Sequence, residues 1–380
     1  MKQHRECLLS LGAEHLLVKS AYTGVAASLI GGKTTHTVGM LSSRSRGRMS
    51  EDTKAKLQSF WKEKTYLIID EFSMISKSFL AKLSCNLSIG KQGGESYHEG
   101  ISFGGINVIL CGDLHQFPLV AQRHHERLYH PNDPAHDPLE TQIGHTLYEE
   151  FDTVVVLKEQ IHVTDTRWCQ LLNNLRQGQV QQEDLQMLHE LIINTSQNDN
   201  LNEEPWASAC LVTPRHAVRM MWNEYSSRKW CQHAGEQLFI CTAEDTIGNK
   251  SLTQTKKYCL AMQTTSRKGS KIQLPNQIEV AKGMKVLVTN NIATDLDITN
   301  GACGEIIDII LHPDEPTLHS GSIVHLHHLP ICILVKLTRM RASILNNLDK
   351  HMVPIELLST TIQIDLLMIG TGKAQRSVVR

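Results

Sequence analysis

The chain has 380 residues, of which 41% are hydrophobic and 20% are charged, and its formal net charge is −1. This composition is typical of a globular protein and argues against a disordered or strongly basic chain. The length predicts two or three domains, and no apolar stretch approaches the twenty residues that a membrane span requires.

The cysteines are scattered without any Cys-x-x-Cys spacing, and the first residues, Met1–Glu6, include no apolar signal core. Scattered cysteines in a chain without a secretion signal are typical of free thiols in a reducing compartment. We therefore expect an intracellular protein.

The first predicted element is a buried strand at Leu16–Val18. It leads into two segments, Tyr22–Ala27 and Gly31–His36, that are rich in small residues, hydroxyls and backbone donors. Such groups suit contacts with sugar and phosphate, to which most protein–nucleic acid hydrogen bonds go. This block therefore indicates a surface for nucleic acid.

A basic loop, Ser42–Arg48, follows that block. Residues 1–50 hold seven lysines and arginines against two glutamates. Two interpretations stay open: a solvated loop, or a loop in which Arg46 contacts phosphate beside Thr34 and His36. The second predicts binding that weakens with salt.

The next block, Tyr66–Ile75, begins with an apolar run that ends in Asp70 and Glu71. The run predicts a fully buried parallel strand, which delivers its last residues to the sheet edge where α/β proteins bind ligands. There one carboxylate can hold Mg²⁺ and the next can polarise a water against a γ-phosphate. A strand followed by a capped helix is the structural alternative.

The third block, Gly105–Pro118, is another apolar strand that runs into a tight turn at Gly112 and Asp113. Gln116 follows the turn. Its amide both donates and accepts, so it can bond a phosphate oxygen and a neighbouring element together.

Together these blocks resemble the petite-integration-frequency (Pif) DNA helicases, superfamily-one relatives of RecD that include the helicase modules of Helitron transposons. The order is Thr-Gly-x-Ala-Ala…Gly-Gly-x-Thr-x-His, then Ile-Ile-Asp-Glu-x-Ser-Met-Ile, then Cys-Gly-Asp-x-x-Gln-x-Pro. Weaker similarities extend the resemblance over most of residues 15–310, at Leu157–Gln160, Leu175–Gly178, Leu211–Arg215, Gly283–Val288 and Asn300-Gly301.

The resemblance implies 5′-to-3′ DNA unwinding driven by ATP hydrolysis with Mg²⁺. It implies that Asp70 holds the metal, that Glu71 is the general base and that Gln116 senses the γ-phosphate, with Gly112 and Asp113 at the nucleotide. The residues implied to lie along single-stranded DNA are Thr23, Gly24, Thr34 and His36. A nuclear or mitochondrial enzyme of DNA repair, recombination or telomere maintenance is implied, or one of transposition.

The sequence departs from the family pattern in three places. No Gly-x-x-x-x-Gly-Lys-[Ser/Thr] phosphate loop precedes the first strand, and Ala27–Thr34 only imitates one. His162 stands where the family usually has an arginine that reaches the transferring phosphate. The chain reaches Arg380 without the family's Gln-Gly-x-Thr block. We therefore expect a core truncated at both ends, with background ATP turnover.

These departures leave alternatives open. The first is a catalytically impaired helicase fragment that binds single-stranded DNA without ATP turnover. The second is a decayed transposon gene.

The expected fold is α/β, a P-loop NTPase (RecA-like) helicase core in three parts. Residues 1–150 form the first RecA-like domain without its phosphate loop, and 151–282 form part of the second, beginning at Val154–Leu157. Residues 283–380 contain an inserted small β-barrel and a C-terminal tail. The helices and strands expected after residue 150 are Trp168–Arg176 closed by Gly178, Gln182–Ile193, Ala209–Thr213, Lys285–Thr289, Glu305–Ile310 and Cys332–Leu337.

Overall fold

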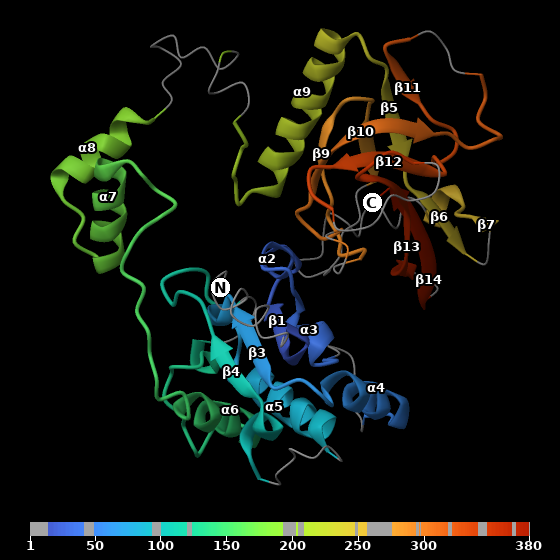
Figure 1. Ribbon diagram of the computed structural model, residues 1–380. Helices are drawn as coiled ribbons and strands as arrows, with labels where there is room; N and C mark the ends of the chain where they lie inside the picture. The colour runs from blue at the N-terminus through green and yellow to red at the C-terminus, as the bar shows by residue number, and fades with distance from the viewer. Residues whose placement is uncertain are drawn as a thin grey trace. The chain divides into compact units, whose positions relative to one another are not determined.

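The computed structural model divides into two compact units, Met1–Cys210 and Leu211–Arg380 (Figure 1). It describes residues 14–41, 49–92, 100–119, 124–192, 203, 209–247, 250–256, 276–293, 296, 298–317, 321–340, 348–366 and 370–379. The boundaries expected near residues 150 and 282 stay predictions. None of the helices in these ranges is both long and apolar enough to cross a membrane.

The first unit contains a four-stranded parallel sheet. Its strands are β1 (Leu17–Ala21), β2 (Lys33–Thr34), β3 (Tyr66–Asp70) and β4 (Asn107–Leu110), in the order β2-β1-β3-β4. The three strands expected from the sequence are confirmed within three residues of their ends. Because all four strands run the same way, their carboxyl ends lie at one edge of the sheet.

Helices accompany these strands in an α/β arrangement. They are α2 (Gly24–Leu29), α3 (Thr35–Val38), α4 (Glu51–Trp61), α5 (Lys77–Lys91) and α6 (Leu139–Glu149), with the 3-10 turns η1 (Glu14–Leu16), η2 (Phe72–Met74), η3 (Ser102–Gly105) and η4 (His124–Glu126). Helices α4 and α5 begin after Ser50 and Ser76, whose hydroxyls each accept a backbone hydrogen bond from the first turn.

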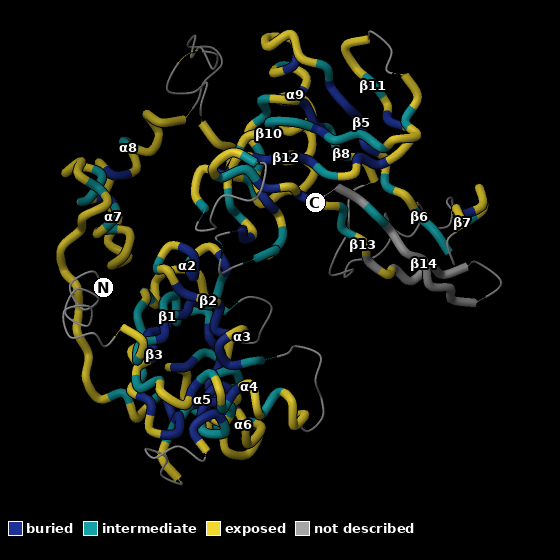
Figure 2. The backbone as a smooth tube through the Cα atoms, turned by 45° about the vertical axis from the view of Figure 1, so that its right-hand side comes forward, coloured by how far each residue is buried: buried dark blue, intermediate teal, exposed yellow. Residues whose placement is uncertain are grey.

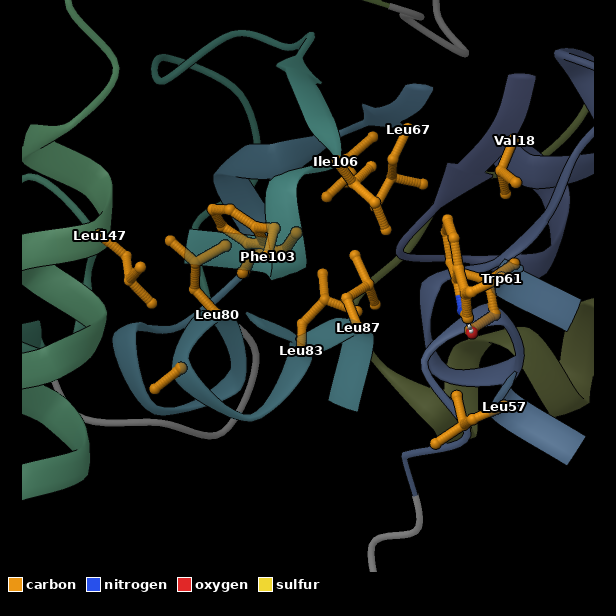
Figure 3. Close-up of a cluster of buried hydrophobic side chains, with 14 of the residues drawn as sticks. Val18, Leu57, Trp61, Leu67, Leu80, Leu83, Leu87, Phe103, Ile106 and Leu147 are labelled. Carbon is orange, nitrogen blue, oxygen red and sulfur yellow. Dashed lines mark hydrogen bonds between the residues drawn. The ribbon is translucent and has the colours of Figure 1, made fainter. Parts of the chain in front are cut away.

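The core of the first unit lies between the sheet and helices α4 and α5 (Figure 3). Leu80, Leu83 and Leu87 share one face of α5 and are fully buried. The Trp61 indole is also fully buried, and its Nε1 donates to the Val38 carbonyl at 3.0 Å. Each such leucine contributes roughly 1.5–3 kcal/mol of hydrophobic stabilisation.

A helical pair follows in the same unit, α7 (Thr166–Gln177) and α8 (Gln182–Glu190). Gly178 closes α7 with φ 67°, as expected from the sequence. Helix α8 ends three residues before the predicted Ile193.

Two apolar segments have no regular secondary structure. Val154–Leu157 forms neither helix nor strand, and its residues are 70–89% exposed. The prediction of a buried strand at Ala209–Thr213 is wrong, since no strand forms there and Val212 is 93% exposed. A strand needs a neighbouring strand for its backbone hydrogen bonds, and an apolar run does not by itself supply one.

The second unit contains one long helix, α9 (His216–Ala234), and two sheets. The strands are β5 (Leu238–Thr242), β6 (Glu244–Ile247), β7 (Lys250–Ser251), β8 (Gln277–Val280), β9 (Lys285–Leu287), β10 (Cys303–Ile310), β11 (Ile323–His325), β12 (Cys332–Leu337), β13 (Met352–Leu366) and β14 (Gly370–Val379). A seven-stranded sheet has the order β7-β6-β14-β13-β12-β10-β9, and a three-stranded sheet has the order β11-β5-β8.

All pairs in the seven-stranded sheet are antiparallel. Figure 2 shows burial concentrated on strands such as β5, where Leu238–Cys241 are all buried. The three strands predicted after residue 280 are confirmed, and a turn lies at Asn300-Gly301, where Gly301 has φ 94°. The inserted barrel stays a prediction.

Candidate functional site

The carboxyl edge of the parallel sheet brings two of the sequence blocks together. Strands β3 and β4 pair in parallel with Ile69 opposite Leu110, and the Cys111 N–H continues the ladder to the Ile69 carbonyl at 2.8 Å. Asp70 and Asp113 therefore leave adjacent strands at the same edge. This is the place where parallel α/β sheets bind their ligands.

Two further hydrogen bonds hold the turns after these strands together. The Phe72 N–H donates to the Cys111 carbonyl at 3.2 Å, and the Ser73 hydroxyl donates to the Phe117 carbonyl at 3.1 Å. The two blocks therefore form one continuous surface, although they lie about forty residues apart in the sequence.

Glu71 has an unusual backbone at this edge. Its φ of 56° and ψ of 43° lie in the left-handed region, which non-glycine residues seldom adopt and which costs about 1–3 kcal/mol. Burial raises the pKa of its carboxyl, and the negative charges of Asp70 and Asp113 raise it further. A carboxylate with a raised pKa is a better proton acceptor.

Asp113 is bound by an arginine of the block Leu175–Gly178, to which the sequence assigned no role. Arg176, in the last turn of α7, approaches the carboxylate with both terminal nitrogens: Nη1 lies 2.5 Å from Oδ2 and Nη2 lies 2.9 Å from Oδ1. The hydrogen bond from Arg176 lowers the pKa of Asp113 to about 2. No spacing rule links residues so far apart, so the sequence pattern held no signal for this pair.

Gln116 lies in the turn that Asp113 begins. Its backbone N–H donates to the Asp113 carbonyl at 3.1 Å, and its side chain is exposed. Gly112 and Asp113 together set the direction of this turn. The structure thus places Asp70, Glu71 and the turn carrying Gln116 at the same edge.

The residues expected along DNA have local structural roles. The Thr23 hydroxyl accepts from the Ala26 N–H at 3.3 Å and caps α2, and the Thr34 hydroxyl accepts from the Thr37 N–H at 3.3 Å and caps α3. Gly24 is buried in α2. Contact of these residues with DNA stays a prediction.

His36 belongs to a cluster of three rings. Its ring centroid lies 4.9 Å from that of Phe79 and 5.2 Å from that of Tyr22, both in edge-to-face geometry. Burial lowers the pKa of His36, which favours a neutral imidazole at neutral pH. Arg46 lies outside the described residues.

The segment Ala27–Thr34 does not have the strand-loop-helix arrangement of a phosphate loop. Its first residue is buried in α2, and Lys33 lies in β2. A Cβ on Gly32 would lie 2.3 Å from the Lys19 carbonyl oxygen, so this glycine allows a close backbone approach within the sheet. His162 is exposed in the segment between α6 and α7.

The carboxylates at this edge suit a metal ion that takes some of its ligands from the protein and the others from a bound substrate. Within the described ranges, no group of three or more His, Cys, Asp or Glu side chains has the arrangement of a self-contained metal site. Mg²⁺ in nucleotide enzymes commonly uses one or two carboxylates together with phosphate oxygens and water. Asp70 fits the first of these ligands.

Comparison with known proteins supports the same family as the motifs. The profile of the family described as PIF1-like helicase matches residues 5–131. The ATP-dependent DNA helicase PIF1 of Candida albicans is 31% identical over 174 residues, which is 42% of this chain and 17% of that protein. The Xenopus laevis protein of the same name is 24% identical over 294 residues, 76% of this chain and 39% of that protein. The chain thus spans less than half of either relative.

Solved structures have a similar fold. The crystal structure of Pif1 helicase from Candida albicans aligns with a TM-score of 0.54 at 18% identity and covers 100% of this chain and 75% of that one. The crystal structure of Bacteroides Pif1 bound to ssDNA aligns with a TM-score of 0.54 at 17% identity, covering 98% and 72%. At these identities the likeness shows a shared RecA-like α/β fold.

Proposed function

We propose that this chain, whose residues 5–131 match the profile of the PIF1-like helicases, carries the nucleotide edge of an ATP-dependent DNA helicase that unwinds in the 5′-to-3′ direction. One observation carries the proposal: Asp70, Glu71 and the turn from Gly112 to Gln116 lie together at the carboxyl edge of a parallel sheet. This edge combines a metal ligand, a proton acceptor and a neutral amide, which nucleotide hydrolysis requires.

The proposed roles follow from the position of each group. Asp70 would bind Mg²⁺, which in turn neutralises phosphate charge when ATP is bound. Glu71 would accept a proton from the attacking water, helped by its raised pKa. The exposed amide of Gln116 would contact the γ-phosphate, and Gly112 and Asp113 would hold its turn.

The proposed nucleic-acid partner is single-stranded DNA, bound on the surface that includes Thr23, Gly24, Thr34, His36 and Arg46. Hydroxyls and helix caps suit phosphate and sugar contacts. A nuclear or mitochondrial role in repair, recombination, telomere maintenance or transposon replication is proposed on the same family basis.

A second candidate function is binding of single-stranded DNA without ATP turnover. Two observations favour it. The Ala27–Thr34 segment, which resembles a phosphate loop in sequence only, forms a helix and a strand, and His162 stands where the family usually has an arginine. Loss of an arginine finger lowers phosphoryl-transfer rates on the order of 10³–10⁵-fold.

The deciding experiment measures ATP hydrolysis by the purified chain with and without single-stranded DNA, beside Glu71→Gln. Unwinding of duplexes with a 5′ or a 3′ overhang is measured in parallel. DNA-stimulated turnover that collapses in Glu71→Gln, with preference for the 5′ overhang, supports the helicase. DNA binding with background turnover supports the second candidate, and a chain that binds neither DNA nor nucleotide contradicts both.

A further inference from the structure

The ion pair between Arg176 and Asp113 joins α7 to the edge of the parallel sheet. The two nitrogens of the guanidinium meet the two oxygens of the carboxylate at 2.5 and 2.9 Å. This two-point contact fixes the carboxylate in orientation as well as in position. A single hydrogen bond would leave the carboxylate free to rotate.

Asp113 is also the residue that shapes the turn carrying Gln116. Its Oδ1 accepts from the His115 N–H at 2.9 Å, and its carbonyl accepts from the Gln116 N–H at 3.1 Å. The side chain that Arg176 holds is therefore the side chain that organises this turn. A change in the guanidinium position is transmitted to the Gln116 backbone through Asp113.

Hydrogen bonds at both ends hold α7, the helix that carries Arg176, in place. The Asp165 carboxylate accepts from the Trp168 N–H at 2.8 Å at the start of the helix. Asn174 donates to Asp184 of α8 at 2.8 Å, and Asp184 is buried. Arg176 is thus presented from a capped and braced helix.

The exposure of the pair favours orientation over stability as its role. The Arg176 side chain is 43% exposed and that of Asp113 is 24% exposed. Ion pairs as exposed as this one contribute little to the free energy of folding because water screens them. Their geometry still restricts where the paired groups point.

We propose that Arg176 is a positioning residue that holds Asp113 and thereby fixes the turn presenting Gln116 to the γ-phosphate. The γ-phosphate part of this proposal rests on the proposed function, and the holding of the turn does not. Arg176 acts through Asp113, and α7 is thereby coupled to the phosphate-facing edge.

The first measurement is amide hydrogen exchange of the full chain without nucleotide. We expect Arg176→Gln to speed exchange at His115 and Gln116 about three- to tenfold, because the turn opens more often when Asp113 is released. Arg176→Lys should restore part of the protection, and Arg167→Gln, an exposed arginine in the first turn of α7, should leave it unchanged. Unchanged exchange in Arg176→Gln would overturn the proposal.

The second measurement compares binding of Mg-ADP with binding of Mg-ADP and aluminium fluoride, which mimics the transferring phosphate. We expect Arg176→Gln to weaken the analogue about tenfold and to leave ADP nearly unchanged, since only the analogue reaches Gln116. The double variant Asp113→Asn with Arg176→Gln should lose no more than the single one. Equal weakening of both ligands would show a general structural role and overturn the positioning role.

Failure of the two proposals is distinguishable. If the wild-type chain binds neither ligand, the proposed nucleotide function fails and the γ-phosphate role of Arg176 fails with it. The exchange measurement still decides whether Arg176 holds the turn. If the wild type binds both ligands and Arg176→Gln binds each of them as tightly as the wild type does, only the γ-phosphate role of Arg176 fails.

Discussion

Gly112 and Phe72 approach each other so closely that no side chain fits between them. A Cβ on Gly112 would lie 2.9 Å from Phe72 Cδ1 and 3.0 Å from the Phe72 nitrogen. The φ of Gly112 is 155°, at the limit of the region that favours glycine. At this contact the turn after β4 packs directly on the turn after β3. The absence of a side chain on Gly112 therefore sets the distance between the turn that follows Asp70 and Glu71 and the turn that carries Asp113.

Replacement of Gly112 by alanine is expected to push these turns apart. We expect Gly112→Ala to lower the free energy of unfolding by about 1–3 kcal/mol, the usual range for an added methyl group in a packed site. Urea unfolding measures this change. Gly100→Ala is the matched control, because Gly100 also has a positive φ, 83°, but has open space around its Cβ position. Equal losses in the two variants would mean that backbone strain, and not the contact with Phe72, sets the cost.

The raised pKa of Glu71 predicts a pH-dependent gain in stability for Glu71→Gln. The folded chain binds the Glu71 proton more tightly than the unfolded chain, so stability falls as pH rises from the ordinary carboxyl pKa of 4.5 through the raised value. At pH 7 we expect Glu71→Gln to be more stable than the wild type, with a gap that closes towards pH 4. Thermal unfolding over this range checks the sign, and Glu190→Gln controls for the removal of a surface charge. A Glu71→Gln protein that is less stable at pH 7 would contradict the assignment.

The core of the first unit predicts a large effect at Leu83. This side chain is fully buried on α5, so Leu83→Ala should cost about 2–5 kcal/mol through reduced burial and the cavity left behind. Leu29→Ala removes the same atoms from a side chain that is 66% exposed and should cost less than about 0.5 kcal/mol. Urea unfolding of both variants is the measurement, and similar losses would place the core elsewhere.

DNA contact at His36 can be separated from its packing. His36→Phe keeps a ring beside Tyr22 and Phe79, whereas His36→Ala removes it. If the imidazole nitrogens contact phosphate, both variants should weaken binding of single-stranded DNA. If the ring only packs, His36→Phe should bind as the wild type does.

The basic loop adds a test of charge. Arg46→Glu combined with His36→Ala should weaken DNA binding and reduce the slope of log affinity against log salt by about one for each phosphate that the variant no longer binds. Titration of a fluorescent oligonucleotide at several salt concentrations measures both. Unchanged affinity and slope would count against this surface.

The local features of the fold were readable from the sequence. Three of the four strands of the first unit (β1, β3 and β4), the closure of α7 at Gly178 and the strand at Cys332–Leu337 each depend on residues that are neighbours in the chain. Apolar periodicity and a terminal glycine are local signals, so a sequence pattern suffices to find them. The placement of Asp70 at the ligand-binding edge of a parallel sheet was also expected from the sequence, because parallel strands end at one edge.

Interactions between distant segments were not readable. The pairing of Arg176 with Asp113, the ring cluster around His36 and the exposure of Val212 depend on which elements pack together. A run of apolar residues at 209–213 looks the same whether or not a partner strand exists. The sequence by itself therefore determined several helices and strands, the family resemblance and the sheet edge at which Asp70 and Glu71 lie. Only the tertiary structure decided which side chains hold one another there, because such interactions arise from packing over long sequence separations that no local pattern encodes.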